Sequence, residues 1–181
     1  MRTKIRFTRS AMATALIVAL AAAGNTAIAG TATDTLSVTA TVNASCTIDS
    51  TTAVAFGTYD PVSANKTDAL STSAGAINTT CTNGSAAIIT LGQGDNADTG
   101  STDSAPLRRM VGTTNTDQYL SYSLCQDSTD CATPWGNDAA SGETVTGSGT
   151  SDSVAVYGSV AGGQNVKADS YTDSVVVTVT F

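Results

Sequence analysis

Two segments of this chain, one near residue 40 and one at the C-terminal end, alternate apolar and polar residues with a period of two. This alternation restricts both segments to extended strands. Near the start the alternating segment is Leu36 to Val42, and at the end it is Val175 to Phe181. Residues two apart lie on the same face of a strand, so each segment has one apolar face and one polar face. After residue 29, long runs of Leu, Glu, Lys and Arg, which favour helix, are absent, and Thr, Ser and Val are frequent. The sequence therefore predicts an all-β protein.

The interior of the chain carries shorter apolar segments separated by polar turns. Asn83-Gly84 lies between two of them and is a strong signal for a tight hairpin. Polar loops are expected over residues 60–74, 92–105 and 136–153. About seven short strands with such turns favour a β-sandwich. The predicted interior strands are Cys46–Ile48, Val54–Phe56, Ala76–Cys81, Ala86–Leu91, Pro106–Val111, Tyr119–Leu124 and Val154–Val160.

Residues 1–29 have the pattern of a secretory signal peptide. A basic start is followed by the apolar stretch Ala11–Ala23, and Ala27-Ile28-Ala29 provides small residues before a cleavage site. The apolar stretch has about 13 residues, whereas a membrane span needs about 20. The sequence predicts export, with residues 30–43 as an N-terminal strand segment and residues 44–181 as one β-sandwich domain.

Removal of that signal peptide makes the chain strongly acidic. The whole chain has eight basic and fifteen acidic residues, and four of the basic ones lie in residues 1–29. The remainder therefore has four against fifteen, a net charge of −11. Such a surface repels phosphate groups, which argues against nucleic-acid binding and docking on anionic lipid. No apolar segment after residue 29 suggests membrane insertion.

Four cysteines, Cys46, Cys81, Cys125 and Cys131, follow the signal peptide. Export favours disulfides, and zinc binding is disfavoured because the chain has no histidine and no Cys-x-x-Cys spacing. Three pairings are possible. We favour Cys46–Cys81 with Cys125–Cys131.

Signals for catalysis and for cofactors are weak. Without histidine, a Ser-His-Asp triad and most general-base schemes are excluded. Asp95 with Asp98, and Asp127 with Asp130, are paired carboxylates, but they lie in polar loops and fit solvated surface better than a glycosidase or calcium site. Arg108-Arg109 is expected at a strand end facing solvent. We expect no enzymatic activity, no metal and no cofactor.

The two alternating end segments allow two arrangements. They can pair within one molecule, as in an ordinary sandwich. Alternatively, the N-terminal segment can add to an open sheet edge of another molecule, with main-chain hydrogen bonds and alternate side chains in pockets. An open edge needs protection before assembly.

Several motifs are similar to a known family. The segment Thr39-Ala40-Thr41-Val42-Asn43-Ala44-Ser45-Cys46-Thr47-Ile48 resembles the junction of donor strand and first strand in chaperone–usher pilins. The second half resembles the spore coat protein U domain, which archaic, Csu-type pilus subunits share. Two departures are Ala168-Asp169-Ser170, where that domain usually has glycine, and the additional pair Cys125–Cys131. The motifs of the second half are Leu107-Arg108-Arg109-Met110, Leu120-Ser121-Tyr122-Ser123-Leu124, Trp135-Gly136, Val156-Tyr157-Gly158-Ser159-Val160, Gln164 and Tyr171–Phe181.

The resemblance implies an incomplete immunoglobulin-like β-sandwich that lacks its last strand. A periplasmic chaperone would fill the resulting groove, and an outer-membrane usher would exchange it for the N-terminal donor strand of the next pilin subunit. The implied product is a fimbrium at the cell surface, secreted through the periplasm and serving adhesion and biofilm formation. The donor residues would be Asp34, Leu36, Val38, Ala40 and Val42, and the residues lining the acceptor groove and pairing with the chaperone would be Val175, Val177, Val179 and Phe181.

Two other functions fit the sequence less well. One is a secreted spore-coat or extracellular-matrix structural protein of the same domain. The other is a carbohydrate-binding β-sandwich, which needs an exposed aromatic platform. Trp135 and a few tyrosines are the available aromatic residues for such a platform.

Overall fold

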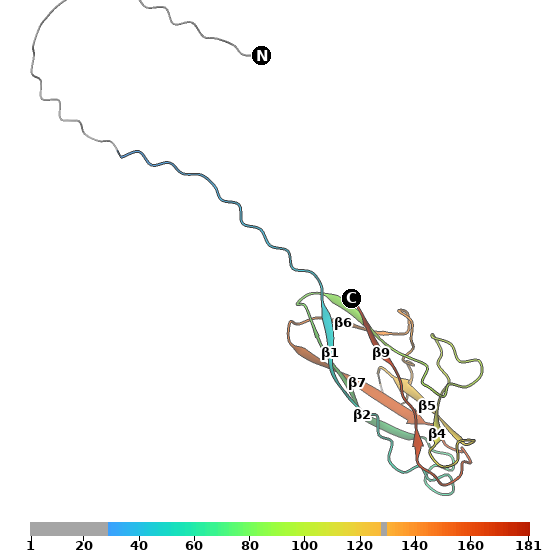
Figure 1. The fold of residues 1–181 in the computed structure, drawn as a ribbon. Helices are drawn as coiled ribbons and strands as arrows, with labels where there is room; N and C mark the ends of the chain where they lie inside the picture. The colour runs from blue at the N-terminus through green and yellow to red at the C-terminus, as the bar shows by residue number, and fades with distance from the viewer. Residues whose placement is uncertain (1–28, 128–129) are drawn as a thin grey trace, which may run out of the picture. The chain divides into compact units, whose positions relative to one another are not determined.

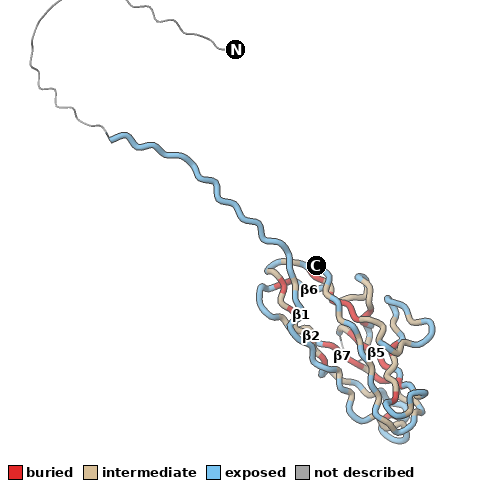
Figure 2. The backbone as a smooth tube through the Cα atoms, in the orientation of Figure 1, coloured by how far each residue is buried: buried red, intermediate tan, exposed pale blue. Residues whose placement is uncertain are grey.

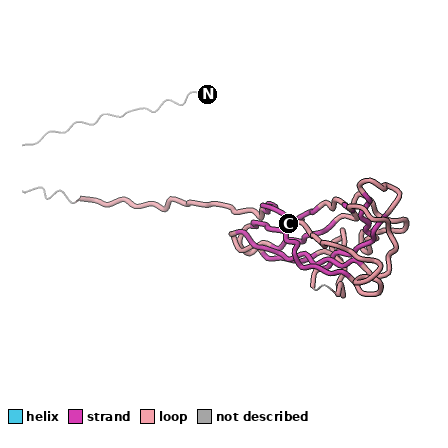
Figure 3. The backbone as a smooth tube through the Cα atoms, turned by 90° about the horizontal axis from the view of Figure 1, so that it is seen from below, coloured by secondary structure: helices cyan, strands magenta, loops and turns pink. Residues whose placement is uncertain are grey.

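The computed structural model describes residues 29–127 and 130–181, so the predicted signal peptide lies almost wholly outside the described residues. The chain divides into two units, residues 1–40 and 41–181. The described residues form strands and loops only, as Figure 3 shows, and include no helix that could cross a membrane. The strands are β1 (Cys46–Thr52), β2 (Leu70–Cys81), β3 (Ala86–Leu91), β4 (Arg108–Gly112), β5 (Tyr119–Cys125), β6 (Glu143–Thr146), β7 (Ser151–Val160), β8 (Tyr171–Thr172) and β9 (Val177–Thr180).

Two antiparallel sheets make up the second unit (Figure 1). The larger sheet has the order β1-β2-β7-β5-β4-β8, and the smaller has the order β6-β3-β9. From Tyr119 to Leu124 in β5 the residues alternate between exposed and buried, because Leu120, Tyr122 and Leu124 point inward. This alternation is the period-two pattern of the sequence, and it places one apolar face of each sheet against the other.

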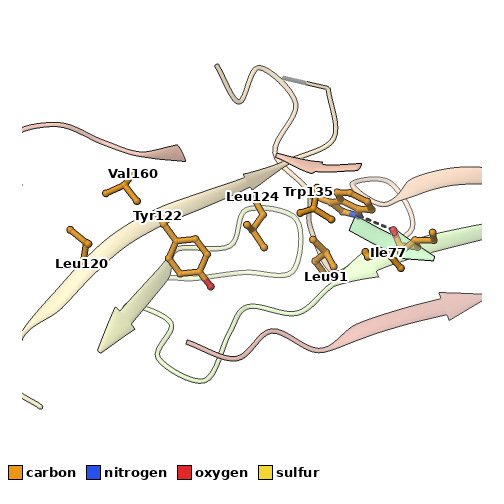
Figure 4. Close-up of a cluster of buried hydrophobic side chains, with 9 residues drawn as sticks. Ile77, Leu91, Leu120, Tyr122, Leu124, Trp135 and Val160 are labelled. Atoms are coloured by element: carbon orange, nitrogen blue, oxygen red, sulfur yellow. Dashed lines mark hydrogen bonds between the residues drawn. The ribbon is translucent and has the colours of Figure 1, made fainter. Parts of the chain in front are cut away.

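The core lies between these faces, where Figure 2 shows the buried positions along the strands. Trp135 is fully buried and donates its indole N–H to the Ile89 carbonyl oxygen at 2.8 Å (Figure 4). This bond satisfies the polar atom of the largest core side chain. The other buried apolar members of the cluster are Ile77, Leu91, Leu120, Tyr122, Leu124, Val156 and Val160.

The predicted hairpin between Ala76–Cys81 and Ala86–Leu91 is wrong. A turn does form at Asn83-Gly84, where Gly84 has a φ of +76° and Ser85 N–H donates to the Thr82 carbonyl at 2.9 Å. However, β2 pairs with β1 and β7, whereas β3 pairs with β6 and β9. The turn therefore carries the chain from one sheet to the other, and it does not join two paired strands.

Other strands also differ from the prediction. β6 lies in a stretch predicted as loop, and β2 begins at Leu70, inside another predicted loop. β6 is a short edge strand in which Val145 is the one apolar residue, so its sequence carries little period-two signal. Conversely, Val54 and Phe56 form no strand, although both pack against the core.

The last predicted strand, Tyr171–Phe181, is divided between the two sheets. β8 pairs with β4 in the large sheet, and β9 pairs with β3 in the small sheet. Residues 173–176 connect them without strand pairing. The apolar alternation nevertheless persists through the connection, since Val175 is half-buried and Val176 is 69% exposed.

Candidate functional site

A groove of about 480 Å³ opens over the hydrophobic core. One wall is the end of β1 and the chain after it, from Thr51 to Phe56. The opposite wall is Tyr171–Val175 with Val177 from the start of β9. The floor consists of side chains from the core and its edge, namely Ala76, Ile77, Leu91, Met110, Tyr122, Leu124 and Val156.

The groove lies between two strands that each have one neighbour. Among the described residues, β1 is an edge of the large sheet beside β2, and β9 is an edge of the small sheet beside β3. Figure 1 shows the start of β1 and the C-terminus at the same end of the sandwich. The free sides of these strands carry main-chain N–H and C=O groups that an additional extended segment can pair with.

Of the four residues predicted to line an acceptor groove, two lie in this groove and two do not. Val175 and Val177 line the groove. Val179 pairs with Ile89 and packs against the core, but it is not among the lining residues. Phe181 lies beyond the end of β9 and is 56% exposed.

The opposite wall of the groove was not predicted from the sequence. Val54 and Phe56 line it, and the Phe56 ring meets Tyr122 edge-on at a centroid distance of 6.0 Å. Their alternation with Ala53 and Ala55 was a signal for apolar packing. The sequence predicts a short strand there, whereas the two side chains border the groove without sheet pairing.

A polar cluster borders the groove beside Tyr122. The Tyr122 hydroxyl donates to a carboxylate oxygen of Asp173 at 2.6 Å, and the other oxygen accepts from Asp95 N–H and the Asn96 amide at 3.0 Å each. Burial and the Asp173 carboxylate raise the pKa of Tyr122 well above its ordinary value, so its hydroxyl stays protonated. Asp173 therefore has fixed donors on both oxygens.

Arg108 is buried, so the prediction that it faces solvent is wrong. Its side chain is 2% exposed and donates to three main-chain carbonyls, those of Leu91 at 2.7 Å, Gly92 at 2.8 Å and Trp135 at 2.9 Å. Burial lowers the pKa of the guanidinium to about 10, which keeps it charged at neutral pH.

Arg109 is closer to the predicted surface position. It forms an ion pair with Asp98 at 2.9 Å, lies 4.3 Å over the Tyr119 ring, and keeps a partly exposed side chain.

The predicted donor segment forms no strand and is exposed along its described length, as Figure 2 shows. Leu36, Val38 and Val42 are 87%, 86% and 84% exposed. Ala40 is exposed too, and the Asp34 carboxylate accepts a hydrogen bond from the next residue, Thr35. Exposure of three large apolar side chains on one face is typical of a segment that gains stability by binding.

The cysteines pair as Cys46–Cys81 and Cys125–Cys131, the pairing that we favoured from the sequence. Cys46 and Cys81 are direct partners across β1 and β2, so this disulfide fastens the edge strand beside the groove. Cys125–Cys131 closes a short loop before Trp135. Within residues 29–127 and 130–181, no cluster of acidic or cysteine side chains could hold a metal ion.

The chain is similar to known proteins over nearly all of its length. The family model of the Spore Coat Protein U domain matches residues 15–178. Protein U of Myxococcus xanthus is 42% identical over 179 residues, which cover 96% of this chain and 98% of that protein. The family resemblance inferred from the motifs is thereby confirmed.

A solved structure is similar in fold. It is the chaperone–tip adhesion subunit pre-assembly complex from the archaic chaperone–usher Csu pili of Acinetobacter baumannii. The TM-score is 0.51 at 20% identity, and the match covers 78% of this chain but 40% of the matched chain. At 20% identity, this similarity is evidence for a shared fold alone. The predicted immunoglobulin-like β-sandwich is confirmed.

Proposed function

The chain belongs to the spore coat protein U domain family, and from this membership and the open groove we propose that it is a structural pilus subunit. Subunits polymerise by donor-strand exchange: residues 30–43 of one copy occupy the groove of the next. The resulting fimbrium supports adhesion and biofilm formation. The subunit has no catalytic role.

The observation that carries the proposal is the presence of two complementary features in one chain. The groove exposes core side chains between two strands with free edges. The N-terminal segment exposes apolar side chains with the alternation of a strand. A strand placed in the groove pairs its main chain with a free edge and buries alternate side chains. Full burial of Leu36 or Val38 contributes about 1.5–3 kcal/mol each.

Repetition of this contact from copy to copy is heterologous and produces a fibre. Before assembly, the apolar groove needs a cover, because unpaired strand edges invite uncontrolled association. The proposed partners are therefore other pilin subunits, a periplasmic chaperone that covers the groove, and an outer-membrane usher that catalyses the exchange. The proposed route is export by residues 1–29, passage through the periplasm and assembly at the cell surface.

The boundary between donor segment and domain is supported by contacts of Ser45. Its N–H donates to the Thr82 hydroxyl at 3.1 Å, and its carbonyl accepts from Thr82 N–H at 2.9 Å. Cys46 then begins β1 and is fixed to Cys81. In the proposed division, residues from 44 onward belong to the β-sandwich, and residues 30–43 supply the donor strand.

Deletion of Thr31–Val42 from the exported protein tests the proposal. We expect the deleted chain to be recovered with its chaperone as a one-to-one complex, but not in polymers. A finer test is the double substitution Leu36→Asp and Val38→Asp, which places charges on the apolar face and should abolish polymers. The matched control is Ser37→Asp with Thr39→Asp on the opposite face, which should polymerise.

Polymers are measured by electron microscopy and by ladders on gels without heat denaturation. The proposal is wrong if the intact protein is a stable monomer with its own N-terminal segment docked, and the deletion merely unfolds that monomer. It is also wrong if the two double substitutions reduce polymers equally.

A coat or matrix protein of the same domain is the second candidate. It is favoured by the full-length similarity to Protein U of Myxococcus xanthus. This candidate predicts deposition on a cell or spore surface without fibres. The carbohydrate-binding alternative loses its best aromatic residue, because Trp135 is fully buried.

A further inference from the structure

We infer that the Tyr122–Asp173 hydrogen bond positions residues 173–176 as a ready-formed wall of the groove, so that an incoming strand meets an ordered site. This inference rests on the proposed function. It assigns a positioning role in strand capture to a hydroxyl–carboxylate pair at the edge of the groove.

The wall formed by residues 173–176 has no strand pairing to order it. β8 ends at Thr172, β9 begins at Val177, and the residues between them cross from the large sheet to the small one. A segment of this kind, with one side on an open groove, would lose much conformational freedom if a binding strand had to order it.

Contacts from the loop after β3 replace the missing strand pairing. Gly92 N–H donates to the Val176 carbonyl at 2.8 Å, and Asp95 N–H lies 3.1 Å from the Ser174 carbonyl. Asp95 N–H and the Asn96 amide also donate to Asp173, and Tyr122 donates from the other side. The segment is therefore fixed from the loop on one side and from β5 on the other.

The loop approaches this segment closely. Gly94 has a φ of +85°, and a Cβ atom there would collide with the Asp173 carboxylate. A Cβ atom on Gly92 would lie 3.5 Å from the main chain of Val176. Position 94 thus requires glycine for two reasons: its φ is positive, and a side chain would collide with Asp173.

Arg108 fixes the beginning of the same loop. Its guanidinium donates hydrogen bonds to the carbonyls of Leu91 and Gly92, and its positive charge attracts the Asp173 carboxylate. Two residues of the large sheet therefore act on this wall: Arg108 in β4 through the loop, and Tyr122 in β5 directly.

An ordered wall affects capture more than release. If only a fraction of molecules has the wall in place, the apparent affinity is the intrinsic affinity multiplied by that fraction, because the strand binds the competent form. In the occupied groove the added strand holds the wall as well. Loss of the Tyr122 hydroxyl should therefore lower the association rate and leave the dissociation rate nearly unchanged.

The test uses the full exported chain with Leu36→Asp and Val38→Asp, so that its own segment leaves the groove free. The probe is a fluorescent peptide of residues 31–43 with the natural sequence. Tyr122→Phe removes only the hydroxyl. The matched control is Tyr59→Phe, since the Tyr59 hydroxyl contacts the Ala161 carbonyl at 3.0 Å and Tyr59 does not line the groove.

We expect Tyr122→Phe to slow association about tenfold, the effect of losing one hydrogen bond to a charged group, with dissociation within about twofold of the parent. Tyr59→Phe should bind at the parent rate. Equal association rates for Tyr122→Phe and the parent would overturn the inference, as would equal slowing by both substitutions. If the parent itself does not bind the peptide, the proposed function fails instead, and the inference with it.

Hydrogen exchange on the parent protein gives a second test that needs no substitution at Tyr122. The amides of Gly92 and Asp95 should be protected before the peptide is added and gain little on binding. If these amides exchange freely in the unbound protein and become protected only with peptide, the strand orders the wall, and the inference is wrong.

Discussion

Arg108 joins the two sheets beneath the groove. It begins β4 in the large sheet, and its guanidinium donates to carbonyls at the end of β3 in the small sheet and to Trp135. The bonds to the Leu91 and Trp135 carbonyls are buried, where water cannot replace a lost donor, and the bond to the Gly92 carbonyl is partly buried. The charge is thus kept in the interior by three main-chain acceptors, with a favourable electrostatic contribution from the Asp173 carboxylate.

Arg108→Met should lower the free energy of unfolding by about 3 kcal/mol, because it leaves buried carbonyls without donors. The neighbouring Arg109→Met should lower it less, by about 1 kcal/mol, since the ion pair of Arg109 and its hydrogen bonds to the Asn96 and Ala97 carbonyls are partly exposed. Denaturant unfolding of both variants, with saturating peptide of residues 31–43, measures the difference. Equal losses would contradict the assigned role of Arg108.

Asp169 gives the protein a pH-dependent contribution to stability. It lies in the turn before β8, and it accepts hydrogen bonds from the N–H groups of Asn115 at 2.6 Å and Thr114 at 2.9 Å. The Asn115 bond is the main cause of a pKa held well below the ordinary value for an aspartate. The carboxylate thus stabilises the fold above about pH 4, and this contribution disappears as pH falls toward the folded-state pKa.

Asp169→Asn should therefore lower the thermal midpoint at pH 7, and the difference from the natural protein should shrink at pH 3 and below. The reason is that below about pH 4 the Asp169 carboxylate takes up a proton in the unfolded chain before it does so in the folded protein, and this favours unfolding of the natural protein. Melting curves of both proteins across this range give the test. A difference that stays constant between pH 7 and pH 2 would show that the carboxylate charge is not what stabilises the turn.

At the scale of the element, β1 depends on its disulfide. It is an edge strand with β2 as its neighbour, and Cys46–Cys81 fixes its first residue with a sequence separation of 35. The chain-entropy model gives about 4 kcal/mol for this loop and about 2 kcal/mol for the separation of 6 in Cys125–Cys131. Replacing the first pair by alanine should therefore cost more stability than replacing the second, as urea unfolding can measure. A larger loss of stability from removing Cys125–Cys131 would mean that β1 does not depend on the Cys46–Cys81 disulfide.

The accuracy of the sequence predictions also differs from one element to another. Strands with one buried face, such as β5 and β7, carry a period-two signal and were found. Pairing between strands was harder: the Asn83-Gly84 turn indicated a reversal, but partners from distant parts of the chain decided the sheets. Arg108 was missed for the same reason, because its three acceptors come from segments 16 to 27 residues away. Period and turn chemistry are local, whereas sheet order and buried charge depend on distant contacts.

At the scale of the whole molecule, the chain separates a core with an open side from a segment suited to close it. Both end segments share the same alternation, yet they differ in burial: Val177 and Val179 pack against the core, whereas Leu36 and Val38 are exposed. A chain that buried both alternating segments in its own core would be a complete β-sandwich as a monomer. Under the proposed function, the free edges of β1 and β9 make the stability of one subunit dependent on a strand from another molecule.

Added donor peptide should therefore stabilise the protein by mass action. With its own segment disabled by Leu36→Asp and Val38→Asp, the protein should gain about 2.7 kcal/mol when the peptide of residues 31–43 is present at 100 times its dissociation constant. The gain should rise with the logarithm of peptide concentration. Thermal unfolding at several concentrations measures both.

The control peptide has the same composition but places its apolar residues in one block. It cannot present alternate side chains to the groove in any register, because only a period of two puts them on one face of a strand. It should therefore raise the melting temperature little. If the block peptide stabilises as well as the natural one, the groove binds apolar chains without requiring a strand, and the alternation at the N-terminus has another purpose.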